Sequence, residues 1–149
     1  MTSGDPSGGA KPIPRPVLAW GLAGLIPFLG LPGLSLAAPE LSAGCDRALG
    51  LYAAVILSFL GGARWGQEVA SAAPDPRLIA LSMAPSVAAW ALALLPPGHA
   101  GLQLAGLAGA LVLHLLWDLR SQGLPGWYPR LRLILTAGAV AGLAAGALL

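Results

Sequence analysis

Charged residues are scarce in this chain, and so is cysteine. Only 9% of the 149 residues are charged, whereas a soluble domain carries about 25%. That deficit leaves too few polar side chains to cover a surface in water, and it also excludes a disordered chain, which needs high charge and low hydrophobicity. Cys45 is the only cysteine, which excludes an internal disulfide framework and a cysteine-based zinc cluster. Because 56% of the residues are hydrophobic, the composition is typical of a small integral membrane protein.

Long apolar stretches separated by short polar links make up most of the chain. A helix needs about 20 predominantly apolar residues to cross the hydrocarbon core of a bilayer. Five stretches meet that requirement, at residues 17–38, 48–66, 78–95, 100–117 and 131–149. The strands of a membrane barrel would alternate apolar and polar residues, and these stretches do not. We therefore expect an all-α integral membrane protein, with an up-and-down bundle of five transmembrane helices as a single domain over 17–149 and a disordered tail over 1–16.

Three prolines fall inside the expected spans, Pro27 and Pro32 in the first and Pro85 in the third. Each removes a helical hydrogen bond and crowds the preceding turn, so each predicts a kink. A kink of this kind is tolerated as a packing feature inside a bundle, and this is the interpretation we favour over a hinge in a transporter.

The basic residues predict the orientation of the bundle. All of them except Arg47 fall at one end of the expected helices: Lys11, Arg15, Arg64, Arg77, Arg120, Arg130 and Arg132. Because cytoplasmic loops are enriched in Lys and Arg, the amino terminus is expected in the cytoplasm and the carboxyl terminus outside. A cleaved secretory signal over 11–37 is an alternative, and it would leave the remaining helices in the same orientation. The net charge of +2 is dispersed over helix ends, so we expect no nucleic-acid partner.

Two rows of small residues recur at every fourth position. The first is Gly50, Ala54, Ser58, Gly62 and Gly66, and the second is Gly138, Gly142 and Gly146. Such a row lies along one stripe of a helix and lets a neighbouring backbone approach closely. We interpret both rows as packing surfaces within the bundle, with association between copies, and hence a homo-oligomer, as the alternative.

Charged and aromatic residues gather at the expected cytoplasmic end. The candidate contact cluster consists of Arg64, Trp65, Asp118, Trp127, Tyr128 and Arg132. An arginine at the edge of the hydrocarbon must pair or reach the interface, and Asp118 is the natural partner of Arg64, with Arg132 competing for it. The simpler interpretation is a belt of interfacial aromatic and anchoring residues. The sharper hypothesis is a pocket for an anionic headgroup, since arginine and aromatic rims suit phosphate or carboxylate.

Catalytic and metal-binding signatures are weak in this sequence. His114 and Asp118 are four residues apart, on one helical face, and with Glu68 they could hold a metal or relay a proton. A simple His–Asp hydrogen bond explains that spacing better. The chain has no nucleophile elbow, phosphate-binding loop, zinc-protease motif or dinucleotide fingerprint. We therefore expect no catalytic residue, no cofactor and no metal.

Several strings distributed over the chain are similar to one membrane family. They are Gly24–Phe28, Tyr52, Ile56–Gly62, Trp65–Gly66, Pro85–Ser86, Trp90, Asp118, Pro125, Trp127–Tyr128, Leu131–Arg132 and Leu135–Thr136. Together they resemble the transmembrane-protein-69-like family, a domain of unknown function found in bacteria and mitochondria. The resemblance covers the chain from Val17 to its end, and it implies a multi-pass protein with no established activity.

Taken together, the residues predict a non-enzymatic multi-pass protein of a bacterial cytoplasmic membrane. Its expected partners are the bilayer itself and an anionic lipid or another membrane protein at the contact cluster. The alternative hypothesis is a small transporter or carrier of amphiphiles that uses the proline-kinked helices.

Overall fold

The computed structural model describes residues 12–149, and helices account for most of that range. Their order is α1 (Arg15–Ala23), α2 (Ile26–Ala37), the short 3-10 helix η1 (Pro39–Leu41), α3 (Ser42–Val69), α4 (Pro76–Ala93), the short 3-10 helix η2 (Pro97–His99), α5 (Ala100–Arg120) and α6 (Tyr128–Leu148). The described residues contain no strand. Five stretches of helix are long and apolar enough to cross a membrane, with α1 and α2 together forming the first. The predicted all-α fold with five membrane-length segments is confirmed.

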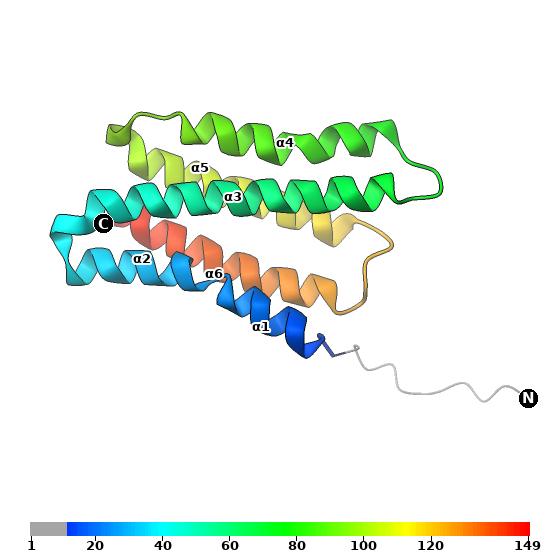
Figure 1. The fold of residues 1–149 in the computed structure, drawn as a ribbon, viewed down its shortest axis with the longest axis horizontal. Helices are drawn as coiled ribbons and strands as arrows, with labels where there is room; N and C mark the ends of the chain where they lie inside the picture. Colours follow the sequence, from blue (N-terminus) through cyan, green and yellow to red (C-terminus); the bar gives the residue numbers. More distant parts are fainter. Residues whose placement is uncertain (1–11) are drawn as a thin grey trace, which may run out of the picture.

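The five spans run alternately in opposite directions, with α1 and α2 following one another in the same direction (Figure 1). Helix α3 packs against α4, α2 and α5, while α6 packs against α5 and α2. Large apolar side chains from four of these helices fill the centre: Phe28, Leu49, Leu57, Leu104, Leu107, Leu111 and Leu143. The carboxyl terminus lies at the opposite end of the bundle from the start of α1 (Figure 1).

The first span differs from the single kinked helix that the sequence predicts. It breaks at Gly24–Leu25 into α1 and α2, because Pro27 has no N–H to donate to a carbonyl in the preceding turn. The Tyr52 hydroxyl donates to the Gly24 carbonyl oxygen at 2.9 Å, so a polar backbone group at the break is satisfied from α3. Pro32 and Pro85, in contrast, lie inside α2 and α4.

Other helix ends extend beyond the expected apolar ranges, because polar residues continue the helices past the hydrocarbon. Helix α3 begins at Ser42 rather than residue 48 and ends at Val69 rather than residue 66. Helix α5 continues to Arg120. At the start of the chain, residues 15 and 16 are already helical, and the rest of the predicted tail up to residue 11 lies outside the described residues.

The glycine row of α6 is a packing surface. A Cβ built on Gly138 would lie 2.7 Å from Leu25, one on Gly146 would lie 2.7 Å from Leu49, and one on Gly142 would overlap the Phe28 backbone. These glycines therefore let α2, α3 and α5 approach α6 closely.

The small-residue row of α3 packs only over its first part. Gly50 lies against Gln103, whereas Gly62 and Gly66 are exposed and a Cβ built on either would meet nothing within 4 Å. The prediction of bundle packing is wrong for those two residues, because that part of the row faces outward. Gly61 takes their place: a Cβ there would lie 2.7 Å from the Ser82 carbonyl oxygen of α4. Ala54 and Ser58 are half-buried, and association between copies stays a prediction.

The described arginines segregate as the sequence predicts. Helices α3 and α5 end where α4 and α6 begin (Figure 1), and we call this the basic end of the bundle. It carries Arg64, Arg77, Arg120, Arg130 and Arg132, with Arg15 at the start of α1. Arg47 lies near the start of α3, at the opposite end, and Lys11 lies outside the described residues. Which end faces the cytoplasm stays a prediction.

Candidate functional site

A buried carboxylate shared by two arginines forms the centre of the basic end. The Nε of Arg64 donates to Oδ1 of Asp118 at 2.8 Å, and the Nε of Arg132 donates to Oδ2 at 2.6 Å. The side chain of Asp118 is 0% exposed. The three residues come from α3, α5 and α6, so this triad joins three helices at one point. The predicted Arg64–Asp118 pair is confirmed, and Arg132 binds the second carboxylate oxygen instead of displacing Arg64.

The charge of the triad is not balanced. Two guanidinium groups face one carboxylate, and the Nη2 atoms of Arg64 and Arg132 are buried without a hydrogen-bond partner among the described residues. Arg64 also donates through Nη1 to Gln67 at 3.1 Å. A buried donor without an acceptor is costly, so the triad retains both positive charge and hydrogen-bonding capacity.

The aromatic partner of the triad is Trp117 rather than Trp65. The guanidinium carbon of Arg64 lies 5.1 Å from the centre of the Trp117 ring, which is within the range of a cation–π contact. Trp65 is 43% exposed on the outer side of α3. The sequence could have indicated Trp117, because it directly precedes Asp118 at the end of the same helix.

Trp127 and Tyr128 lie at the start of α6, one helical turn before Arg132. Their rings meet edge to face with centroids 6.1 Å apart, and both residues are half-buried. Of the six predicted contact residues, the structure thus joins Arg64, Asp118 and Arg132 directly. It places Trp127 and Tyr128 on the adjoining turn and leaves Trp65 facing outward.

A polar cavity of about 470 Å³ opens beside the triad. Arg64, Arg120 and Trp117 line it together with Glu68 and the α5–α6 link. The Glu68 carboxylate accepts a hydrogen bond from the backbone N–H of Asp75 at 2.7 Å, which ties that anion to the α3–α4 link. The cavity therefore presents two arginines and one engaged carboxylate, a combination that suits an anionic group.

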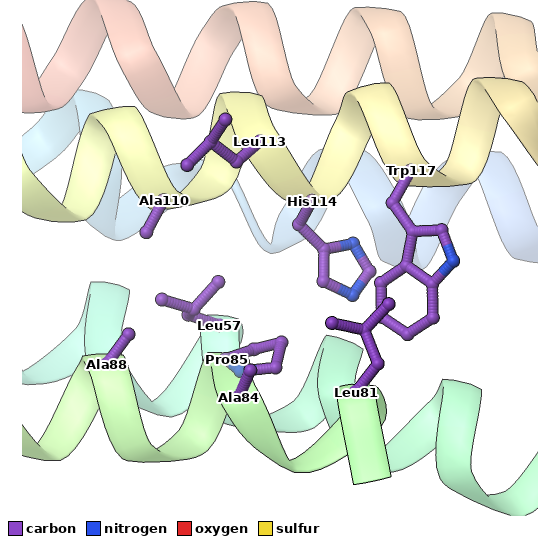
Figure 2. Close-up of a pocket in the computed structure, with 9 residues that line it drawn as sticks. All are labelled: Leu57, Leu81, Ala84, Pro85, Ala88, Ala110, Leu113, His114 and Trp117. Atoms are coloured by element: carbon purple, nitrogen blue, oxygen red, sulfur yellow. The ribbon is translucent and has the colours of Figure 1, made fainter. Parts of the chain in front are cut away.

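A second pocket, of about 270 Å³, lies between α4 and α5. Figure 2 shows His114 and Trp117 pointing from α5 toward Leu57, Leu81 and Pro85. The Nδ1 atom of His114 lies 3.4 Å from Oδ2 of Asp118, so the two residues adjoin. The predicted His–Asp hydrogen bond is wrong, because Nδ1 has no hydrogen-bond partner among the described residues. Within the described part of the chain, no group of three or more His, Cys, Asp and Glu side chains could hold a metal ion.

Comparisons with known proteins identify relatives of the whole domain. A sequence profile of the family described as "Protein of unknown function (DUF3429)" matches residues 13–148. Transmembrane protein 69 of Xenopus tropicalis is 41% identical over 145 residues, covering 89% of this chain and 54% of that protein. Transmembrane protein 69 of Mus musculus is 39% identical over 84 residues, covering 54% of this chain and 34% of that protein. The chain thus spans about half the length of the Xenopus relative, and no solved structure matches it.

Proposed function

The chain belongs to the DUF3429 family, whose relatives include transmembrane proteins, and from this premise we propose that it is a non-enzymatic protein that binds anionic lipid. The site is the basic end, with the lipid headgroup in the cavity between Arg64 and Arg120. The excess positive charge carries this proposal, because Arg64 and Arg132 share one buried carboxylate and Arg64 also lines the cavity with Arg120.

The position of the cavity supports a headgroup as its occupant. Arg64, Arg120 and Trp117 line it at the basic end, where we expect the helices to meet the membrane surface. A guanidinium can donate two hydrogen bonds to a phosphate, and an aromatic ring at this depth suits the interface between headgroups and acyl chains. We assign this end to the cytoplasmic side of a bacterial inner membrane, where anionic lipids attract basic segments.

The alternative, a small carrier of amphiphiles, depends on the broken first span and on Pro85. In carriers, broken helices direct free backbone groups at a substrate. Here the carbonyl oxygen of Gly24 accepts a hydrogen bond from Tyr52, so the break is tied to α3 within the bundle. This contact favours a fixed packing element, and for that reason we propose lipid binding rather than transport.

Native mass spectrometry from a mild detergent tests the proposal with phosphatidylglycerol and phosphatidylcholine as probes. The informative variant is Arg120→Gln, because Arg120 lines the cavity but is not part of the triad. We expect the wild-type chain to bind the anionic lipid more tightly, and Arg120→Gln to weaken that binding about three- to tenfold.

The matched control is Arg47→Gln, which removes one positive charge at the opposite end of the bundle. It should leave the preference for phosphatidylglycerol unchanged. Equal affinity for the two lipids, or equal losses in the two variants, would show that the cavity is not a headgroup site.

A further inference from the structure

The pocket between α4 and α5 is apolar apart from one buried histidine. Leu57, Leu81, Pro85 and alanines of both helices line it, and His114 points into it from α5 (Figure 2). His114 is only 4% exposed. The pocket has a volume of about 270 Å³. A cavity of roughly 150 Å³ holds a benzene molecule, so a ligand with two fused rings is of a suitable size.

Neither ring nitrogen of His114 has a hydrogen-bond partner among the described residues. Burying an imidazole in this way costs free energy unless a partner is supplied. The Nδ1 atom faces the Asp118 carboxylate at 3.4 Å, whereas Nε2 has no such neighbour. A molecule entering the pocket can supply the missing partner of Nε2.

The surroundings of His114 determine what kind of partner Nε2 needs. A carboxylate can only accept hydrogen bonds, so the edge facing Asp118 carries the ring proton on Nδ1. The Nε2 atom is then a lone-pair acceptor, and its partner must be a donor.

Pro85 removes one helical hydrogen bond beside the same pocket. In a regular helix the residue at position 85 would donate its N–H to the carbonyl oxygen of Leu81, and proline has no N–H. Leu81 and Pro85 both line the pocket. The unpartnered Nε2 atom of His114 therefore favours a ligand with a hydrogen-bond donor and disfavours one with acceptors alone.

We propose that this pocket binds a hydrophobic alcohol from the bilayer, an apolar molecule whose hydroxyl group donates to Nε2 of His114. The apolar body of the ligand would lie against Leu57 and Pro85 and reach the pocket laterally from the membrane. The site shares Trp117 with the headgroup cavity but does not use Arg120, so variants of His114 and Arg120 test the two proposals separately.

Naphthol and its methyl ether provide the test, because they share an apolar body and differ in the hydroxyl donor. Binding is measured by calorimetric titration of the full chain in phosphatidylcholine nanodiscs, with empty nanodiscs subtracted. We expect naphthol to bind about tenfold more tightly than the ether. In His114→Leu the two ligands should bind equally, and in the control His99→Leu the preference should remain, because His99 lies in η2 at the other end of α5.

Two further measurements keep the proposal falsifiable if His114→Leu does not fold. The ¹⁵N shift of Nε2 in the unaltered chain should change with naphthol and not with the ether, because only naphthol donates to that atom. Ala110→Leu should fill the pocket and abolish binding of both ligands. Failure of naphthol to bind, equal binding of the ether to the wild type, or a preference that survives in His114→Leu would each overturn the proposal.

Discussion

Among single residues, Asp118 has the largest consequences for the basic end, because it accepts from arginines on two other helices. Replacing it with Asn would leave two buried guanidinium groups without a carboxylate. Removing one partner of a buried ion pair costs about 3–5 kcal/mol, so Asp118→Asn should lower the free energy of unfolding by about that amount. Reversible unfolding in mixed detergent micelles measures this change in the free energy of unfolding.

The control for this prediction is Asp46→Asn in α3. Asp46 forms no salt bridge with any residue that the structure describes, so its neutralisation should change stability little. Similar losses in the two variants would mean that the triad contributes nothing beyond the general effect of removing a carboxylate.

The contacts of Asp118 and its arginines were only partly predictable from the sequence. The positions of Arg64 and Asp118 at neighbouring helix ends were enough to predict their pairing. Deciding whether Trp65 or Trp117 is the aromatic partner of Arg64 requires knowing how α3 is rotated about its own axis. Successive residues on a helix point in directions that differ by about 100°. Hydropathy does not specify that rotation, so the aromatic partner and the simultaneous contact of Arg132 became visible only in the fold.

At the scale of helices, a methyl group added to the glycine row of α6 should reduce stability, whereas one added to the exposed end of the α3 row should not. Gly142 faces the Phe28 backbone so closely that an added methyl group would overlap it, whereas Gly62 faces open space. Overpacking a tight contact costs about 1–3 kcal/mol, and backbone atoms cannot move aside as a flexible side chain can. Gly142→Ala should therefore lose at least about 1 kcal/mol of stability in micelles, while Gly62→Ala should lose nothing. Equal effects would contradict the packing role of Gly142.

The break in the first span leads to a prediction about Tyr52. Its hydroxyl group bonds to the carbonyl oxygen of Gly24 at 2.9 Å, and its ring meets Phe28 edge to face. Tyr52→Phe removes only the hydrogen bond, so stability should fall by about 0.5–1.5 kcal/mol. Hydrogen exchange should become faster around residues 24–26. Val55→Ala, on an exposed part of α3, should leave exchange at the break unchanged. Unaltered exchange in Tyr52→Phe would show that the bond does not stabilise the break.

The elements themselves were largely predictable, since long apolar stretches in lipid must form helices to satisfy their backbones. The prolines predicted that the first span is irregular, but not that it breaks into two helices. Pro27 separates two helices, while Pro32 lies within α2, and which outcome occurs depends on whether a neighbour such as Tyr52 supplies a partner. The packing role of Gly61 was missed because the pattern of every fourth residue selects Gly62 instead.

For the molecule as a whole, α5 connects two chemically different regions. His114 lines the apolar pocket, and Asp118, one turn later, holds the two arginines. Trp117 contacts both regions, because it lines the pocket and also stacks with Arg64. Both proposed sites therefore lie toward the basic end. The pocket at His114 is apolar and opens to the side of the bundle, and the headgroup cavity is charged and lies at its end. Composition predicts a membrane bundle, but only the packing order of the helices places these sites next to each other.

The orientation of the bundle leads to the last prediction. Gln122 lies in the α5–α6 link at the basic end, and Gly98 lies in η2 at the opposite end; both are exposed. In a Cys45→Ser background, Gly98→Cys and Gln122→Cys each leave one accessible thiol. Because basic loops stay in the cytoplasm, a membrane-impermeant maleimide added to intact cells should label position 98, and position 122 only after permeabilisation. The Cys45→Ser chain alone should not be labelled. The reverse pattern would invert the bundle and move the proposed headgroup site to the outer leaflet.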